Sequence, residues 1–282
     1  MSSRFEQILP AAAKPPQLIT ASDAKRELLE RLLRGEANEH ADVSQTILPR
    51  ALDTKAQLSF AQERLWFLDQ LMPDSPFFNV PLAVRLRRPV KLDALQRSVN
   101  EIIRRHEVLR TAFVTVDAEP SLIISPCLES KIKIIELGSL DATTAEAESR
   151  KLIHEEVQRP FDVSRAPLIR TTLIRLSATD SILLLTMHHI VSDGWSLLLF
   201  FKELAALYEG FLANRAPQVP ALTIQYADYA LWQKDWLRDE VVKPQLAYWK
   251  DQLGGDLPIL DLPTDSARPV VQTYNGAREV LT

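Results

Sequence analysis

Two adjacent histidines, His188 and His189, close an apolar run that begins at Leu183, and Asp193-Gly194 follows shortly after them. The run is typical of a strand buried on both faces. Imidazole acts as a base near neutral pH, so a histidine at the end of such a strand can take a proton from a substrate. Successive strand side chains point to opposite faces. The spacing therefore predicts one reacting histidine and one packing histidine.

A turn and a new helix follow the two histidines. Asp193 lies past the strand end, where its carboxylate can brace the loop, and Gly194 is free to take a positive φ and to admit a close approach. Apolar residues recur at helical spacing over residues 196–213, which predicts a helix whose amino terminus meets the loop. A helix amino terminus favours negative charge. The histidine loop and this helix amino terminus together suit a reaction in which a base acts next to a substrate atom that gains negative charge.

Two other interpretations of the histidines compete with catalysis. An isolated His-His pair is most often a hydrogen-bonded part of a core, and the Asp-Gly that follows is what favours a reactive role. A zinc or iron site needs ligands that converge, whereas adjacent strand residues diverge. The chain has no Cys-x-x-Cys, no His-Glu-x-x-His and no Gly-rich phosphate loop. We therefore expect neither a bound metal nor an intrinsic cofactor.

The composition is that of an ordinary globular protein with one large or two smaller domains. Of 282 residues, 46% are hydrophobic and 25% are charged, with a net charge of -4. The acidic balance argues against a nucleic-acid partner. The single cysteine, Cys127, fits a reducing compartment, and the sequence shows neither a signal core nor an apolar run long enough for a membrane span. We expect a cytoplasmic protein with no membrane partner.

The chain divides into three regions. Residues 1–56 hold a proline-containing leader, a short helix over about 22–35 and a polar linker. The helix is either a docking element or a linker helix that rests on the main domain, because isolated helices this short are marginal. Residues 57–250 carry the main pattern of helices and strands, and residues 251–282 contain several prolines that indicate a crossover.

The central region alternates helical and strand patterns irregularly, which is typical of an α+β fold. Thr143 and Glu146 have the spacing of a capping box, which predicts where the third helix begins. A tight polar turn between the last two strands indicates an antiparallel hairpin. The predicted elements before the histidines are helices over 58–71, 95–109 and 143–158 and strands over 80–86, 122–125, 131–136, 168–176 and 181–187.

Four blocks of sequence, in order and in spacing, resemble the first four motifs of condensation domains from nonribosomal peptide synthetases. They are residues 59–68, 105–113, 188–196 and 226–233. A single His-His-x-x-x-Asp-Gly is a moderate signal, whereas four ordered blocks are specific. The resemblance implies a fold similar to chloramphenicol acetyltransferase, with two lobes in a V, a tunnel between them and the histidine motif at its middle.

The resemblance also implies roles for individual residues. His189, the second histidine, corresponds to the catalytic one, and His188 supports it. Asp193 is expected to be structural, in a salt bridge with Arg105. Gly194 is expected to leave room beside His189, with its backbone N–H facing the reacting carbonyl.

Three further positions follow from the same motifs. Arg110 and Trp232 match residues that support the site. Trp195, directly after the glycine, is most similar to the subtype that accepts an L-configured donor. Cyclising relatives carry Asp where His188 stands, and epimerising relatives usually lack the Trp, so both of these subtypes are disfavoured.

The implied reaction is amide-bond formation between two thioesters on the phosphopantetheine arms of donor and acceptor carrier proteins, with an adjacent adenylation domain as a further partner. Domains of this family have about twice the length of the first lobe, so by resemblance the chain is the amino-terminal lobe plus the start of the second, whose first strand is expected from residue 276. We expect this stretch alone to be inactive or severely impaired and to expose an apolar face that the other lobe covers. The alternatives are a CoA-dependent acyltransferase, an epimerisation domain and a noncatalytic docking platform for carrier proteins.

Overall fold

The computed structural model describes residues 46–51, 53–260, 262–267 and 270. The elements in chain order are α2 (Phe60–Leu71), η1 (Pro76–Phe78), β1 (Asn79–Leu86), α3 (Leu92–Arg105), η2 (Glu107–Arg110), β2 (Thr111–Val116), β3 (Glu119–Ile124), β4 (Lys133–Glu136), α4 (Ala142–Gln158), β5 (Ile169–Arg175), β6 (Ser181–His188), α5 (Gly194–Leu212), α6 (Tyr226–Trp236) and α7 (Asp239–Gln252). The predicted α+β class is confirmed. The predicted helix over 22–35 and the strand expected from residue 276 lie outside the described residues.

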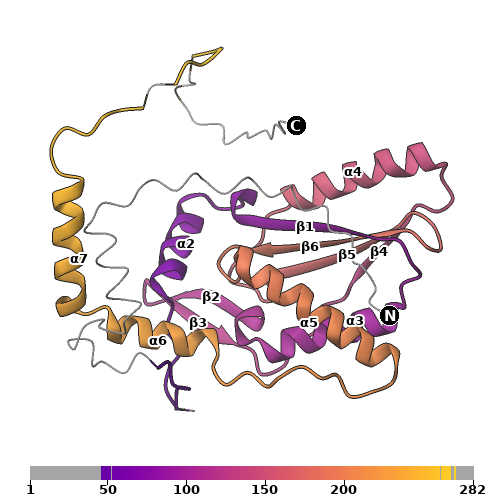
Figure 1. Ribbon diagram of the computed structural model, residues 1–282, viewed down its shortest axis with the longest axis horizontal. Helices are drawn as coiled ribbons and strands as arrows, with labels where there is room; N and C mark the ends of the chain where they lie inside the picture. The colour runs from indigo at the N-terminus through magenta and orange to yellow at the C-terminus, as the bar shows by residue number, and fades with distance from the viewer. Residues whose placement is uncertain (1–45, 52, 261, 268–269, 271–282) are drawn as a thin grey trace, which may run out of the picture.

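A mixed sheet in the order β1-β6-β5-β4 forms the centre of the fold (Figure 1). Strand β6 is antiparallel to both β1 and β5, whereas β4 is parallel to β5. The predicted hairpin of the last two strands is confirmed as β5 and β6. Every residue of β6 is buried, as the continuous apolar run predicts. The histidine motif therefore begins at the end of the best-covered strand of the sheet.

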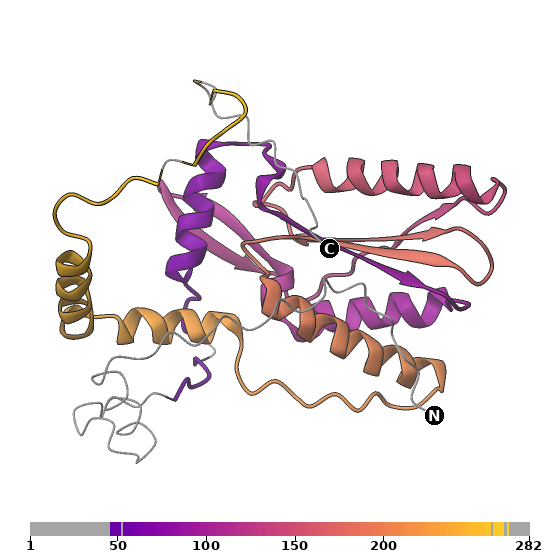
Figure 2. The same ribbon diagram turned by 45° about the horizontal axis from the view of Figure 1, so that its top comes forward.

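The side chains of β6 alternate between two cores. Leu183 and Leu185 belong to the large core shared with α3 and α5, whereas Ile182 packs with Ala145 of α4 in a smaller one. Figures 1 and 2 show α4 on one face of the sheet and α3 and α5 on the other. A fully buried aliphatic side chain contributes about 1.5–3 kcal/mol, so both faces hold β6 in place.

Helix α3 ends earlier than the apolar pattern predicts. The pattern extends to Leu109, but the helix stops at Arg105 because His106 is extended, with φ -99° and ψ 104°. The next four residues form the 3-10 turn η2, and Leu109 is still buried. The chain changes direction at His106, so that Leu109 stays in the core and the chain continues from η2 into β2.

The capping box expected from Thr143 and Glu146 is wrong. Asp141 caps α4, accepting hydrogen bonds from the backbone N–H groups of Thr143 and Thr144. Glu146 instead forms an ion pair with Arg85 of β1, at 3.1 Å. A carboxylate one residue before the helix is the better cap, and the helix ends at Gln158 as predicted.

The segment after the histidines contains one predicted helix and two that the pattern does not indicate. The helix expected over 196–213 is confirmed as α5, whereas α6 and α7 follow it without a clear signal. Strand β2 is a further element that was not predicted, and it pairs with β3 in a separate antiparallel hairpin.

Helix α7 has no buried residue and lies away from the sheet in Figure 1. Its side chains Leu246, Tyr248 and Trp249 are all exposed. The part of α7 that carries them is therefore available for contact with further protein.

Candidate active site

His188, the last residue of β6, is a packing histidine. Its side chain is 1% exposed, and the rings of Phe78 and Phe161 lie edge-on to it with centroids 6.0 and 6.2 Å away. Its Nδ1 accepts a hydrogen bond from the backbone N–H of Ile190 at 3.1 Å. Burial, together with a smaller electrostatic contribution from the neighbouring His189, lowers the pKa of His188 to about 4. His188 is therefore neutral at physiological pH.

His189 is exposed, in contrast to the buried His188. Its Nδ1 lies 2.5 Å from the carbonyl oxygen of Ser192. A carbonyl oxygen only accepts hydrogen bonds, so Nδ1 must carry the proton and donate it. The neutral ring then presents Nε2 with a free lone pair, which is the form that a base requires. The backbone N–H of His189 also donates to the carbonyl of Phe78, at 2.8 Å.

Asp193 is the N-cap of α5. Its Oδ1 accepts a hydrogen bond from the backbone N–H of Ser196 at 2.7 Å, and its own N–H donates to the Ser196 hydroxyl at 2.6 Å. The Ser196 N–H and hydroxyl both donate to this carboxylate and lower the pKa of Asp193, and the nearby His189 contributes in the same direction. The carboxylate therefore caps the first turn of α5.

The salt bridge expected between Asp193 and Arg105 is wrong. Arg105 Nε lies 3.2 Å from Glu203 of α5, and its Nη2 donates to the carbonyl of Pro220 at 2.6 Å. Glu203 also binds His106, with Oε2 3.0 Å from Nε2. The carboxylate of Asp193 caps α5. The carboxylate that binds Arg105 and His106 of the second motif block is that of Glu203, which lies further along the same helix.

Gln62 of α2 contacts the histidine loop directly. Its Nε2 donates to the carbonyl oxygen of Ile190 at 3.2 Å, and the side chain is 3% exposed. Gln62 lies in the first of the four motif blocks, but the sequence gives it no role. The signal that could have found it is the Ser-x-x-Gln spacing from Ser59, which marks a buried helix start.

Ion pairs of Arg50 and hydrogen bonds of Gln225 connect the second and fourth motif blocks. Arg50 donates to Glu107 at 2.6 Å and to Asp228 at 2.7 Å. Gln225 accepts from the backbone N–H of Glu107 at 3.0 Å and donates to the carbonyl of Arg105, also at 3.0 Å. The sequence points to none of these residues except Arg105 as part of the site, because their contacts join segments that are far apart in the chain.

Arg110 and Trp232, predicted to support the site, contact neighbouring residues. Arg110 donates to the carbonyl of Ser125 and lies 3.8 Å from Glu107. Trp232 stacks on Trp236 of the same helix with ring centroids 5.3 Å apart. In the described part of the chain, the buried indole N–H of Trp232 has no hydrogen-bond partner. Neither residue forms a hydrogen bond or ion pair with His189 among the described contacts.

Gly194 and Trp195 open α5 beside the histidine loop. The backbone of Gly194 does not take the positive φ that its identity allows, and a Cβ atom there would meet no atom within 4 Å. Trp195 is 73% exposed. The front of α5 is therefore open around Gly194.

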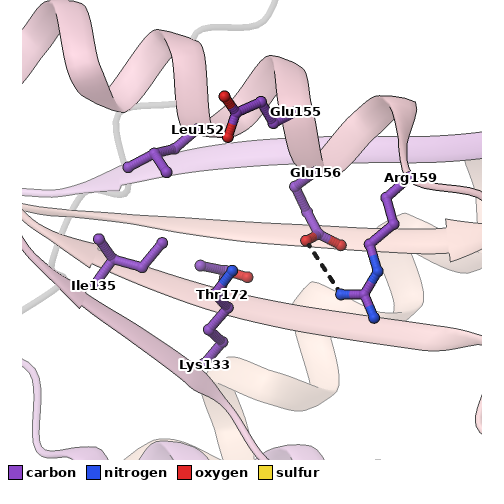
Figure 3. Close-up of a pocket in the computed structure, with 7 residues that line it drawn as sticks. All are labelled: Lys133, Ile135, Leu152, Glu155, Glu156, Arg159 and Thr172. Atoms are coloured by element: carbon purple, nitrogen blue, oxygen red, sulfur yellow. Dashed lines mark ion pairs between the residues drawn. The ribbon is translucent and has the colours of Figure 1, made fainter.

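A cleft of about 210 Å³ lies elsewhere, between the carboxyl-terminal half of α4 and strands β4 and β5. Figure 3 shows its lining residues, which are Lys133, Ile135, Leu152, Glu155, Glu156, Arg159 and Thr172. It contains neither histidine of the motif. The negative charge of Glu156 in this lining is partly neutralised, because Glu156 pairs with Arg170 and lies 3.8 Å from Arg159.

The described ranges contain neither a metal-binding cluster nor a membrane-spanning helix. No group of three or more His, Cys, Asp or Glu side chains there could hold a metal ion. Among the same residues, no helix has the length and apolar character needed to cross a membrane.

Comparison with known proteins gives a consistent set of similarities. A family model described as the condensation domain matches residues 53–282. One component of the linear gramicidin synthase of Brevibacillus parabrevis is 48% identical over 235 residues, which is 83% of this chain and 5% of that protein. Phosphinothricin tripeptide synthetase PhsC of Streptomyces viridochromogenes is 40% identical over 264 residues, covering 93% of this chain and 24% of the relative. The chain thus spans a small part of the synthetases it matches.

Solved structures extend the similarity to the fold. The X-domain, solved in complex with OxyB from teicoplanin biosynthesis, matches with a TM-score of 0.70 and 28% identity, over 80% of this chain and 49% of that one. A variant of the starter condensation domain of rhizomide synthetase RzmA, in complex with C8-CoA, matches with a TM-score of 0.65 and 19% identity, over 72% of this chain and 46% of that one. The match therefore spans about half the length of these solved chains.

Proposed function

The chain belongs to the condensation domain family, and we propose that it supplies the histidine that promotes amide-bond formation between carrier-bound thioesters. The observation that carries the proposal is the state of His189. Its ring is exposed, and its Nδ1–H is bound to the carbonyl of Ser192, so Nε2 is free to accept a proton. A nucleophilic amine needs such an acceptor at neutral pH.

The chemical step follows from this geometry. The α-amine of the acceptor aminoacyl group attacks the thioester carbonyl of the donor, the C–N bond forms, and the C–S bond breaks as the tetrahedral intermediate collapses. Nε2 of His189 takes the proton that the amine loses and returns it to the departing thiolate, so the ring is neutral again at the end of the step. The carboxylate of Asp193 interacts electrostatically with His189 and attracts the positive charge that the ring carries while it holds this proton.

Gly194 and Asp193 shape the space in front of the ring. The backbone N–H of Gly194 opens α5, where a helix amino terminus favours the oxyanion of the intermediate. The open volume at Gly194 leaves room for the reacting carbonyl. His188 does not react, because it is buried and neutral, and it holds the loop through Ile190.

The partners of the reaction are donor and acceptor carrier proteins whose phosphopantetheine arms bring the substrates, together with an adenylation domain. Trp195 supports an L-configured donor. The exposed apolar residues of α7 suit contact with a second lobe, since the match spans only about half of the solved chains of this fold. The single cysteine of the chain supports the cytoplasm as the compartment.

A second candidate, acyl transfer from CoA, is favoured by one observation. The RzmA starter domain shares the fold and was solved in complex with C8-CoA. At 19% identity that match shows the fold alone. The relatives that match at 40–48% identity are peptide synthetases, which favours carrier-bound substrates.

The test is a His189→Ala variant of the complete synthetase that contains this chain, supplied with loaded donor and acceptor carriers. Mass spectrometry of the acceptor measures amide formation directly. We expect the rate to fall by about 10²–10⁴-fold if proton transfer limits the step, and by less if positioning of the amine dominates.

The matched control is His154→Ala, which removes an exposed histidine from α4. It should condense at the wild-type rate. A His189→Ala enzyme as fast as wild type refutes the assignment of the base. A wild-type enzyme that binds both carriers but transfers nothing supports the docking platform, and transfer from free acyl-CoA supports the second candidate.

A further inference from the structure

We propose that Gln62 is a positioning residue that sets the orientation of the His189 ring through the carbonyl of Ile190. The inference rests on the proposed function of His189. It assigns the first motif block a task in the reaction beyond forming a helix. Gln62 reaches the loop from α2, a helix 128 positions away in sequence from Ile190.

The ring of His189 takes its orientation from the short loop that follows it. Its Nδ1–H binds the carbonyl of Ser192, so the direction of the Nε2 lone pair depends on the path of residues 189–192. Backbone bonds from Val191 to His188 and from Ser192 to His189, at 3.1 and 3.4 Å, tighten this path. A rotation of the Ile190 peptide would move the Ser192 carbonyl and with it the ring.

The amide of Gln62 fixes that peptide. Its Nε2 donates to Ile190 O at 3.2 Å, and the N–H of the same peptide, that of Val191, donates to the carbonyl of His188 at 3.1 Å. In the preceding peptide, the Ile190 N–H donates to His188 Nδ1 at 3.1 Å. Both polar groups of Ile190 are thus bound to buried side chains. Buried hydrogen bonds to backbone groups are costly to leave unmade, so the two peptides that meet at Ile190 each have one favourable orientation.

Gln62 is itself held without freedom to turn. Its Oε1 accepts from the backbone N–H of Ser59 at 3.1 Å, and its own backbone N–H donates to Ser59 Oγ at 3.2 Å. Ser59 Oγ lies 3.0 Å from the hydroxyl of Tyr226 at the start of α6. A continuous chain of hydrogen bonds therefore joins α6, α2 and the histidine loop, and the amide can present only its donor to Ile190.

A Gln62→Glu substitution separates positioning from helix capping. Glu keeps the oxygen that accepts from Ser59, and Ser-x-x-Glu is itself a capping box, so α2 stays capped. The Nε2 donor is replaced by an oxygen that faces the carbonyl of Ile190. A role in capping alone predicts no loss, whereas positioning predicts a displaced loop. The protonated acid can donate again, so the defect should grow as the pH rises.

The matched control is Gln70→Glu, the same substitution at an exposed position of α2. Gln62→Met, which has a similar length and no hydrogen-bond donor, is a second variant that removes the donor without adding a charge. Circular dichroism and unfolding curves establish that each variant is folded. If Gln62→Glu does not fold, Gln62→Met tests the loss of the donor together with the loss of the oxygen that accepts from Ser59, and the tautomer of the His189 ring remains the readout.

Two readouts test the inference. In the complete synthetase at pH 8, kcat of Gln62→Glu should fall by about 100-fold while KM for each loaded carrier is unchanged, because a misplacement of about 1 Å costs about that much. In ¹⁵N spectra, the His189 ring should be the Nδ1–H tautomer in wild type and in Gln70→Glu, and a mixture of tautomers in the Gln62 variants.

A Gln62→Glu enzyme with wild-type kcat at pH 8, or with an unchanged ring tautomer, overturns the inference. The spectra do not depend on turnover. If His189→Ala condenses at the wild-type rate, the proposed function fails, and the tautomer comparison still decides whether Gln62 orients the ring.

Discussion

Acid should destabilise the fold through His188, and the size of the effect can be worked out from its burial. The pKa of His188 is lowered from its ordinary 6.5 to about 4 by burial, together with a smaller electrostatic contribution from His189. The unfolded chain binds a proton there below about pH 6.5, whereas the folded chain binds it only near pH 4. Between these values the unfolded state holds more protons, so stability falls as the pH falls.

The magnitude follows from the same two values. At about 1.4 kcal/mol per pKa unit, the fall from 6.5 to about 4 corresponds to about 3 kcal/mol, fully present above pH 6.5. By pH 5 about 2 kcal/mol of it is lost. A domain has only about 5–15 kcal/mol of stability in total, so the loss is measurable.

The assay is urea unfolding of wild type and of His188→Asn at several pH values between about 7.5 and 5, a range chosen to bracket most of the titration. Asn can still accept the N–H of Ile190 but does not titrate. The variant should be less stable at pH 7.5, because of the cavity, and should lose about 2 kcal/mol less than wild type on going to pH 5. His154→Asn, at an exposed position of α4, should behave as wild type. Equal pH dependence in wild type and His188→Asn would refute the reasoning.

Two other substitutions test the loop and the start of α5. Asp193→Ala removes the cap of α5, and Asp141→Ala removes the cap of α4, so each should lower the free energy of unfolding in urea by about 1 kcal/mol. Only Asp193→Ala should slow condensation. Equal condensation rates for the two variants would contradict a role for the loop. Gly194→Ala should leave the free energy of unfolding within about 0.5 kcal/mol of wild type, because the methyl group meets open space. The same variant should slow amide formation about tenfold or more if that space receives substrate, and an unchanged rate would exclude this use.

The elements that can be predicted from the sequence are those whose signal is local. The β6 strand, the β5–β6 hairpin and the end of α4 follow from apolar runs and turn residues within a few positions. The apolar pattern places the end of α3 too late because Leu109 remains buried after the helix has stopped, so periodicity continues where the hydrogen bonds do not. Helix α7 has no buried residue in the described structure, and amphipathic patterning gives little signal for it.

The site divides in the same way. The sequence predicts one buried and one exposed histidine from the alternation of strand side chains, and the structure has this difference in burial, although β6 ends at His188 and His189 lies in the turn. The partner of Arg105 does not follow, since nothing local distinguishes Glu203 from Asp193 as the acid that reaches it. The role proposed for Gln62 cannot be predicted from the sequence either, because its contact with Ile190 forms only when two distant segments pack together. Long-range hydrogen bonds are the part of a site that a single sequence shows least.

The pairing of β1 with β6 has a consequence for synthesis on the ribosome. Asn79 pairs with His188, so the first strand of the sheet has no antiparallel neighbour until roughly a hundred further residues have been made. At about 5–20 residues per second, this interval lasts on the order of 5–20 s. During that time an apolar strand edge is unprotected, and the nascent chain must avoid aggregation until the segment that carries the two histidines emerges and completes the sheet.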